Sequence, residues 1–368
     1  MELKKISLAP LALLALAFAS SCSLDEDFRN LEPAAAAGAA DSREIGFEVK
    51  SGLGTRAAAD AAAAAGHAQF RITAFEGESN FYGGRADIVT STDNGHTWAS
   101  DRLRYWPGDR PSDWRGLTFY AYTDGTGADL TARASDRDDF DLSGYVPAIR
   151  DFSVEADVEA QRDLMYAVAK NVSGSRGGKV SLAFRHALSQ ICFTAQNCNP
   201  MIDDIEILDI ELGGVCGRGS YRFPDASTEG GITVVLGGQE GSGWTLDSRA
   251  ADNAYILSDL DMHLGSAGPT GRGEVCNISV PSADAAKAGL RAPMLLLPQS
   301  VEPRIGNAAG GYLKVTVRKT LAGKEAPEAP QTINIPLSAD WQENRCYTYN
   351  ICWKTSSVNF SVNVSDFR

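Results

Sequence analysis

The residue of this sequence with the clearest chemistry is Cys22. Lys4 and Lys5 precede an apolar stretch over 6–18, and three small residues lead from there into the cysteine. A charged start, a short apolar core and a small-residue region are typical of a secretory signal. A cysteine at the next position takes lipid on its thiol and a further acyl chain on the new N-terminus, and two or more chains anchor stably. We therefore expect residues 1–21 to be a lipoprotein signal peptide and Cys22 to be lipidated; an ordinary signal peptide with an incidental cysteine is the alternative.

The residues after Cys22 are acidic, with Asp25, Glu26 and Asp27 in a row. This run resembles the export tag that sends lipoproteins of certain Gram-negative anaerobes to the outer face of the outer membrane. A solvated acidic linker is the alternative, and residues 22–43 are in either case predicted to be an acidic, alanine-rich tether. The formal net charge of the chain is −13. A surface of that sign repels phosphate backbones, so we expect no nucleic-acid partner.

The remaining cysteines and histidines do not form a recognisable metal site. No C-x-x-C pair occurs, and the four histidines lack ligand spacing, so we expect no metal and no cofactor. An exported chain permits disulfides, but their pairing cannot be read from the sequence, and free buried thiols are an equal alternative. The six cysteines in question are Cys192, Cys198, Cys216, Cys276, Cys346 and Cys352.

Three other patterns were weighed for catalysis. Residues 91–98, STDNGHTW, fit the S-x-D-x-G-x-T-W Asp box of sialidases, which is a hairpin-turn device rather than catalytic equipment. The acidic run 136–141 lacks the glycine and glutamate positions of an EF-hand loop, so a solvated loop is favoured over a calcium site. His186 is flanked by apolar residues and is interpreted as a packing histidine. No catalytic residue is predicted, and a glycoside-active enzyme is the weakest hypothesis.

The elements that hold these residues are predicted to be short strands. Residues 44–50 alternate, with Ile45, Phe47 and Val49 on one face. Short extended runs separated by turn residues continue to the end of the chain, and no long segment keeps a helical apolar period, which indicates a sandwich or barrel. The predicted runs are 70–75, 117–122, 164–169, 180–184, 191–195, 205–212, 232–236, 294–297, 313–317, 333–337, 347–353 and 358–364.

Three aromatic stretches carry a family resemblance. They are Arg104-Tyr-Trp-Pro followed by LTFYAY at 117–122, DLMYA at 163–167 with VSLAFRHALSQI at 180–191, and Trp341 with Asn344, Tyr347, Tyr349 and Ile351. Together, over roughly 44–353, they resemble the fimbrillin family (the Mfa-like branch), surface lipoproteins that supply stalk, anchor or tip subunits of type V pili. The resemblance implies an all-β chain of two tandem transthyretin-like β-sandwich domains and no enzymatic activity. With the joint placed at 197–200, we expect domains at 44–198 and 199–368.

The same resemblance implies maturation and assembly with other fimbrial subunits. An arginine-specific protease removes the first strand, and a neighbour's strand fills the vacated groove. The matching site here is Arg56, although Arg43 and Arg71 lie near, so which arginine is cleaved stays open. The displaced strand would carry Ile45, Phe47 and Val49. The sequence does not distinguish a stalk, an anchor or a tip role.

The candidate donor strand is the C-terminus, in which apolar and polar residues alternate. Each apolar side chain would fill a pocket in the β-augmentation mode. Its being merely the last strand of the second sandwich is an equal alternative. A second function hypothesis is a non-polymerising outer-membrane surface lipoprotein that binds glycan or host protein through Trp98, Trp106 and Trp114. The apolar residues of the candidate donor are Val358, Phe360, Val362 and Val364.

Overall fold

The computed structural model shows β-strands along the whole of the chain that it describes, from β1, which begins at Gly46, to β26, which ends at Asp366. Among these residues the helical segments are two single 3-10 turns, η1 (Val158–Ala160) and η2 (Ser248–Ala250). The expectation of an all-β protein is therefore confirmed. The described residues are 43–51, 68–93, 95–124, 140–144, 146–174, 178–224, 226–229, 232–235, 243–269, 271–279, 290–306, 309–354 and 358–367.

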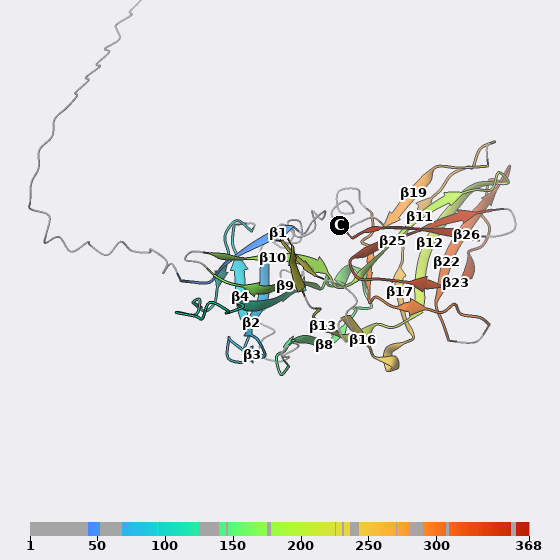
Figure 1. The fold of residues 1–368 in the computed structure, drawn as a ribbon. Coiled ribbons are helices and arrows are strands. Elements are labelled where there is room, and N and C mark those ends of the chain that lie inside the picture. The colour runs from blue at the N-terminus through green and yellow to red at the C-terminus, as the bar shows by residue number, and fades with distance from the viewer. Residues whose placement is uncertain are drawn as a thin grey trace, which may run out of the picture. The chain divides into compact units, whose positions relative to one another are not determined.

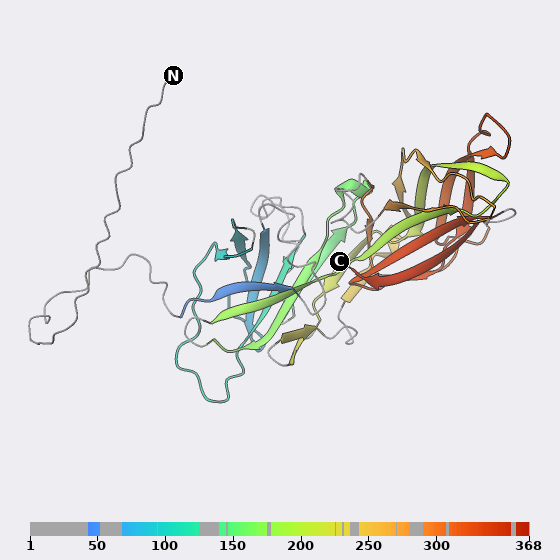
Figure 2. The ribbon, with the colours of Figure 1, turned by 90° about the horizontal axis from the view of Figure 1, so that it is seen from above.

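An eight-stranded sheet occupies the first part of the described chain. Its strand order is β1-β10-β9-β6-β2-β4-β5, with β3 paired to β2. The ladder between β1 and β10 is parallel and the others are antiparallel, and Figures 1 and 2 show β1 lying along β10. The bounds are β1 (Gly46–Ser51), β2 (Ala68–Glu76), β3 (Ser79–Asn80), β4 (Asp87–Ser91), β5 (Ala99–Ser100), β6 (Leu117–Thr123), β9 (Met165–Val172) and β10 (Lys179–His186).

Both faces of this sheet are buried at its centre. On one face, Phe119 and Ala167 belong to a core that also holds Phe47 from β1 and Phe70 from β2. On the other face, Tyr120, Tyr122 and Tyr166 pack against a four-stranded sheet with the order β16-β13-β8-β7. Burial on both sides explains why β6 and β9 read as continuous apolar runs instead of alternating. The bounds are β7 (Phe140–Asp141), β8 (Ala148–Ser153), β13 (Arg218–Arg222) and β16 (Gly243–Leu246).

The later part of the chain forms two five-stranded sheets with a shared core. One has the order β19-β11-β25-β26 with β20 on β11, and the other has the order β17-β12-β22-β23 with β18 on β12. Alternate side chains of both sheets meet in that core, which is the arrangement of a β-sandwich. The bounds are β11 (Ser189–Asn197), β12 (Ile202–Val215), β17 (Asn253–Leu257), β18 (Met262–His263), β19 (Val275–Ser279), β20 (Met294–Leu296), β22 (Tyr312–Leu321), β23 (Gln331–Pro336), β25 (Arg345–Trp353) and β26 (Val358–Asp366).

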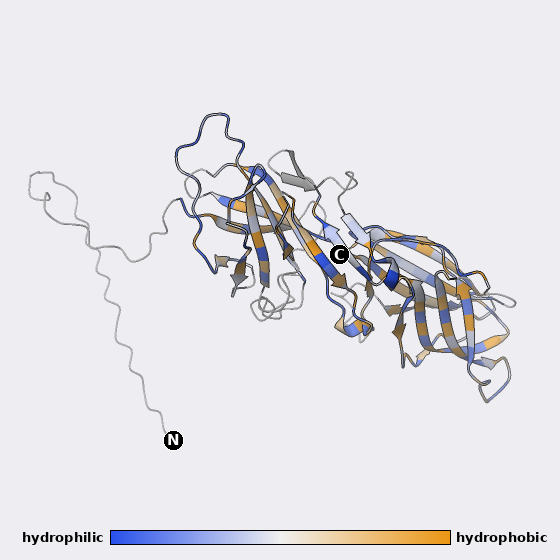
Figure 3. Cartoon of the chain, turned by 90° about the horizontal axis from the view of Figure 1, so that it is seen from below, coloured by the Kyte–Doolittle hydropathy of each residue, from blue (hydrophilic) through white to orange (hydrophobic). Residues whose placement is uncertain are grey.

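Alternating hydropathy accounts for how the sequence specifies these sheets. Figure 3 shows hydrophobic and hydrophilic residues alternating along the strands. In β25, for example, Tyr347, Tyr349, Ile351 and Trp353 enter the core while the residues between them face outward. Two short ladders complete the fold: β14 (Ala226–Glu229) with β15 (Ile232–Val235), and β21 (Ser300–Val301) with β24 (Ala339–Asp340).

Strand pairing crosses the position at which two domains were expected to join. β11 precedes residue 198 and pairs with β19, β20 and β25, which all follow it. β13 and β16 follow residue 198 and extend the sheet of β7 and β8. After β11 the chain turns over 199–202, and the buried Asn197 side chain accepts a hydrogen bond from the Asn199 N–H at 3.0 Å. The division into domains at 44–198 and 199–368 stays a prediction.

The Asp-box sequence forms the turn that its residue types predict. Asp93 Oδ1 accepts a hydrogen bond from the Thr97 N–H at 2.8 Å, and Oδ2 accepts one from the Thr97 hydroxyl at 2.6 Å. Gly95 has a φ of +85°, a value at which a side chain would be strained. The Trp98 ring packs against Phe70 with centroids 5.0 Å apart. The box therefore closes the connection from β4 to β5 and anchors it on the core.

Candidate functional site

The candidate acceptor site is the position that β1 occupies. β1 is the terminal strand of its sheet, and its parallel ladder with β10 runs without interruption from Gly46 to Ser51. On its other side, the residues just before β1 bond to the segment 104–106. The Ile45 N–H donates to the Arg104 carbonyl at 2.8 Å, and the Trp106 N–H donates to the Arg43 carbonyl at 2.8 Å. The N-terminal end of this strand is thus held between two parts of the chain that are distant in sequence.

Side chains of the expected displaced strand enter the core beneath it. Ile45 and Phe47 are each 3 % exposed, and Val49 is partly buried against the same core. The Phe47 ring makes edge contacts with Phe70 and Phe119, with centroids 6.1 and 6.4 Å apart. Aromatic pairs of this geometry contribute beyond the area that they bury. Loss of β1 would therefore open an aromatic-lined apolar groove and leave β10 with an unpaired edge.

A buried ion pair fixes the segment that flanks β1. The Asp87 carboxylate is fully buried and accepts two hydrogen bonds from the Arg104 guanidinium, at 2.7 and 2.8 Å. Arg102 adds a longer contact of 3.3 Å to the same carboxylate. Hydrogen bonding to Asp87 raises the pKa of Arg104. Two parallel bonds to one carboxylate define the orientation of an arginine closely, so this pair positions the backbone that meets Ile45.

The candidate donor strand is folded onto its own sheet. β26 is the terminal strand beside β25, and the antiparallel ladder pairs nine residues, from Val358 with Trp353 to Asp366 with Arg345. Val358 and Phe360 are partly buried against the sandwich core, whereas Val362 and Val364 are 39 % and 57 % exposed. All four apolar side chains share one face, as the alternation predicts, but the second half of that face is poorly covered.

The end of β26 is fastened by a residue outside the alternating pattern. Phe367 is 2 % exposed and stacks on the His186 ring, with centroids 3.6 Å apart and planes 6° from parallel. Asn344 connects the two, because its side-chain oxygen accepts from the His186 N–H at 3.4 Å and its carbonyl accepts from the Phe367 N–H at 3.2 Å. His186 Nδ1 lies 2.7 Å from an Asp163 carboxylate oxygen. The interpretation of His186 as a packing residue agrees with this arrangement.

The sequence analysis identified neither the stacking of Phe367 on His186 nor the ion pair between Asp87 and Arg104. Phe367 breaks the period of two that continues to Val364, so a search for alternation ends before it. Asp87 and Arg104 are 17 residues apart, and only the pairing of β4 with its neighbours brings them together. The weak signal for Asp87 was its place at the start of a strand whose other residues alternate.

The aromatic residues considered for glycan binding contribute mainly to packing. Trp106 is 6 % exposed within the same core as Phe47, and Trp98 and Trp114 are partly buried against it. The Trp114 indole N–H donates to Glu76 at 2.8 Å, and the Trp98 indole N–H donates to the Gly95 carbonyl at 3.1 Å. Because the three rings pack in this core or against it, less of each ring face is accessible to a sugar.

Several expected features lie outside the described residues. Cys22 and Arg56 are among these, as are residues 136–139 of the acidic run. Within the part of the chain that the structure describes, no three His, Cys, Asp or Glu side chains gather as a metal site would require. Over the same residues, no helix has the length and apolar character needed to cross a membrane.

Comparison with known proteins supports the resemblance read from the aromatic stretches. A family model described as fimbrillin-like matches residues 55–366. A solved fimbrial protein from Bacteroides vulgatus shares 14 % identity with a TM-score of 0.56, covering 89 % of this chain and 100 % of that one. The tip fimbrial protein Mfa3 from Porphyromonas gingivalis, solved with a C-terminal truncation, shares 10 % identity with a TM-score of 0.38, covering 81 % and 93 %.

No curated protein matches the chain. The first of the two solved structures shows a common fold. The family match supports a structural role as a cell-surface fimbrial subunit rather than an enzyme, and it implies association with other subunits. Because the match spans most of the sequence, the chain belongs to the fimbrillin-like family.

Proposed function

We propose that this protein is a lipid-anchored precursor of a fimbrial subunit that assembles by strand exchange. Cys22 carries the lipid and holds the precursor at the outer face of the outer membrane. Proteolysis after an arginine releases β1, and a strand from another subunit takes its place beside β10. The observation that carries the proposal is the setting of β1: a terminal strand with a buried Phe47, followed within a few residues by Arg56.

Three nearby arginines are candidates for cleavage, and their positions along the chain favour one of them. Arg71 is 6 % exposed in the middle of β2, where a protease could not reach it without unfolding the sheet. Arg43 is exposed but precedes β1, so cleavage there would leave β1 attached. Cleavage after Arg56 is the cut that separates the whole of β1 from the chain that follows. We therefore propose Arg56 as the processing site.

The proposed donor is β26, which supplies Val358, Phe360, Val362 and Val364 to the groove of the next subunit. Backbone pairing would supply affinity and the alternate side chains would supply register. The incomplete cover of Val362 and Val364 supports this role, because those side chains gain burial on transfer.

An arginine-specific protease provides the first test. Treatment of the purified protein is expected to remove the chain up to Arg56, read by N-terminal sequencing, and to yield ladders that survive cold detergent. Arg56→Ala should block both results, whereas Arg43→Ala should block neither. Monomers that persist after clean removal of β1 would contradict the polymerising role. Incorporation of labelled fatty acid that is lost in Cys22→Ser tests the anchor separately.

A matched pair of variants tests the donor strand. Val362→Asp places a charge on the face that would enter the groove, and Asn363→Asp places the same charge on the opposite face one residue later. Ladder formation should be lost in Val362→Asp and kept in Asn363→Asp. If the two variants formed ladders to the same extent, β26 would be ruled out as the donor.

A second candidate function is favoured by the anchoring of Phe367. A C-terminal strand that is paired over nine residues and fastened at its end suits a terminal or non-polymerising surface lipoprotein. Such a protein would accept a strand or bind a host protein or glycan without donating β26. The protease experiment separates the two functions, since this alternative predicts cleavage without ladders.

A further inference from the structure

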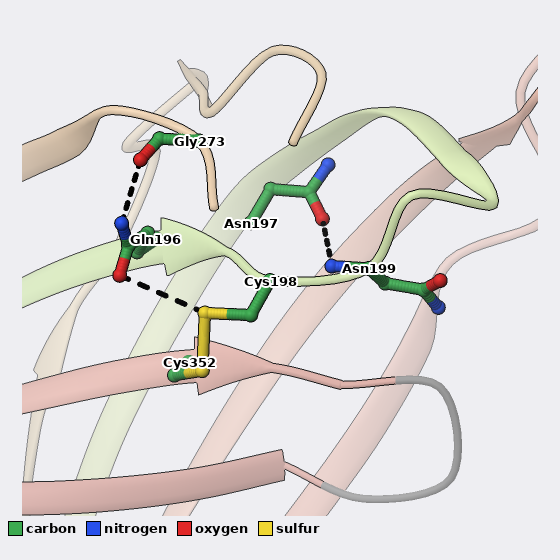
Figure 4. Close-up of a disulfide and its surroundings, with 6 residues drawn as sticks. All are labelled: Gln196, Asn197, Cys198, Asn199, Gly273 and Cys352. Atoms are coloured by element: carbon green, nitrogen blue, oxygen red, sulfur yellow. Dashed lines mark hydrogen bonds between the residues drawn. A yellow bond between two sulfur atoms is a disulfide. The ribbon is translucent and has the colours of Figure 1, made fainter. Parts of the chain in front are cut away.

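Two strands of the sandwich carry four of the six described cysteines. β11 carries Cys192 and is followed directly by Cys198, while its parallel neighbour β25 carries Cys346 and Cys352. Cys198 and Cys352 form a disulfide with their Cα atoms 5.7 Å apart, and Figure 4 shows this bond joining the ends of the two strands. Cys192 and Cys346 are free thiols in the structure, and both are buried.

The parallel register gives the second pair a sequence offset equivalent to that of the first. The ladder is continuous from Ser189 opposite Arg345 to Asn197 opposite Trp353. Cys352 lies opposite Gln196, two residues before Cys198, and Cys346 lies opposite Gln190, two residues before Cys192. The pairs thus share the same offset and the same sequence separation of 154. Side chains on a strand return to the same face every two residues, so a shift of six on both strands preserves the face on which the paired cysteines lie.

The sulfur positions agree with this equivalence. Cys192 Sγ and Cys346 Sγ lie 3.7 Å apart, and the side chains are 1 % and 2 % exposed. Both cysteines point away from the sandwich core, because the residues adjacent to them, Ile191 and Tyr347, enter it. A disulfide holds its sulfur atoms roughly 2 Å apart, so bond formation needs a further approach of the two Sγ atoms from 3.7 Å.

We propose that Cys192 and Cys346 form a second disulfide between β11 and β25 in the exported protein. The two thiols lose two protons and two electrons to the disulfide of an oxidoreductase of the dithiol–disulfide class, which is reduced to its dithiol. The Cys346 thiolate attacks that disulfide to form a mixed disulfide, and the Cys192 thiolate then attacks Cys346 Sγ and expels the oxidant's thiolate. Because both side chains end up buried, this exchange takes place when β25 has paired with β11 and the two thiols face each other, before the pair is covered.

The electrostatics of the pair are consistent with this order of attack. A hydrogen bond from the Cys192 thiol lowers the pKa of Cys346 to about 7, and the same interaction together with burial raises the pKa of Cys192. A thiol whose pKa is close to ambient pH is the better attacking group. The other two described cysteines lack such a partner: Cys216 Sγ contacts the Arg218 carbonyl at 3.2 Å, and Cys276 lies on β19. Cys216 and Cys276 should therefore remain thiols, and they provide a comparison within the same protein.

The consequence of two such bonds rests on the proposed function. If β26 leaves to join a neighbour, β25 becomes the terminal strand of its sheet. Two covalent links six residues apart, which is roughly 20 Å along a strand, would then fasten β25 to β11 near both of its ends. Tension carried through the chain that leads from β25 into β26 would then not separate β25 from β11, and the sandwich core would stay closed.

Peptide mapping of the exported, full-length protein under non-reducing conditions tests the disulfide. Trypsin leaves Cys192, Cys198 and Cys216 on one fragment and Cys346 with Cys352 on another, so a chymotryptic step is needed. Cleavage after Phe193 separates Cys192 from Cys198, and cleavage after Tyr349 separates Cys346 from Cys352. The expected result is a fragment ending at Phe193 linked to one beginning at Cys346, lighter by two hydrogens than the reduced pair. The same fragments found unlinked, or Cys192 linked to any other cysteine, would overturn the proposal.

Thiol counting after denaturation gives an independent readout that does not depend on polymerisation. Apart from Cys22, the proposal predicts two alkylatable thiols, Cys216 and Cys276, whereas a free pair predicts four. Cys192→Ser then discriminates by direction, because it raises the count from two to three if the disulfide exists and lowers it from four to three if it does not. Failure of this test would leave the strand-exchange proposal untouched, since ladder formation is measured separately.

Discussion

Replacing Phe367 with alanine tests how firmly β26 is held on its own sheet. Of the apolar side chains at this end of the chain, Phe367 is fully buried, whereas Val362 and Val364 are 39 % and 57 % exposed. Full burial of a phenylalanine is worth roughly 1.5–3 kcal/mol. Because Phe367 sits at the end of a terminal strand, its loss should lower the free energy of detaching β26 rather than unfold the sandwich.

The assay is native-state hydrogen exchange read on peptides from β26. Each 1.4 kcal/mol changes an opening equilibrium tenfold, so Phe367→Ala should speed exchange of the β26 amides by about 10- to 150-fold. Peptides from β22 on the opposite sheet should exchange at the wild-type rate, since local opening does not involve them. Val364→Ala is the matched control; with less than half of its side chain buried, it should change the same rates by about threefold.

Two results would refute this reasoning. Unchanged exchange of β26 in Phe367→Ala would mean that the stack on His186 contributes nothing to holding the strand. Faster exchange throughout the molecule would mean that Phe367 supports the whole fold, so that β26 is not an independently detachable element.

Three further predictions concern charged residues. Asp87→Asn should lower the free energy of unfolding by about 1–3 kcal/mol in urea titrations, because Arg104 loses its charged partner; a change below about 0.5 kcal/mol would contradict this. Burial raises the pKa of Glu343, which accepts hydrogen bonds from Tyr166 and Tyr221, so its contribution to stability is greatest below pH 4.5 and is lost as pH rises through the raised pKa. The stability of wild type relative to Glu343→Gln should therefore fall as pH rises from 4.5, and a difference independent of pH would be inconsistent with that shift. Hydrogen bonds from Thr97 lower the pKa of Asp93 to about 2, so wild type should lose stability relative to Asp93→Ala between pH 3.8 and 2 in thermal melts, and parallel curves would disprove it.

The strands could be predicted from the sequence because period-two patterning is local. Ile45, Phe47 and Val49 on one face, or Tyr347, Tyr349 and Ile351 on another, fix which side chains enter a core wherever the strand is placed. Their partners are not local. Nothing in residues 44–50 indicates that this strand runs parallel to β10, which follows more than 120 residues later. The donor-strand alternation was visible for the same reason, while its pairing with β25 was not.

The features of the candidate site that the sequence did not predict all depend on how distant strands are aligned with one another. Phe367 leaves the face of Val364 and finds His186, a residue about 180 positions earlier. The relation between Cys192 and Cys346 is invisible until β11 and β25 are aligned, although the equal separation of the two cysteine pairs is present in the sequence. Long-range pairing sets such contacts, and composition and spacing do not report it.

For the proposed strand exchange, the balance of side-chain burial indicates the order of cleavage and exchange. In the sequence, β26 has four apolar residues on one face and the segment of β1 has three. This difference alone would favour replacement of β1 by β26. In the structure, transfer of β26 gains the unburied fractions of Val362 and Val364, about 1.5–3 kcal/mol in all, and gives up Phe367 at a similar cost, so side-chain burial gives no net gain.

Backbone pairing does not reverse this balance, because β26 gives up nine paired positions with β25 and the place of β1 beside β10 offers six. A tethered β1 also competes at high effective concentration. We infer that exchange does not proceed while β1 is attached, and that irreversible cleavage, by removing the competitor and exposing the groove around Phe47, provides the driving force. Uncleaved protein carrying Phe367→Ala should accordingly stay monomeric even though its β26 is loosened, and polymerisation of that variant without proteolysis would show that retention of β26, not of β1, is the controlling step.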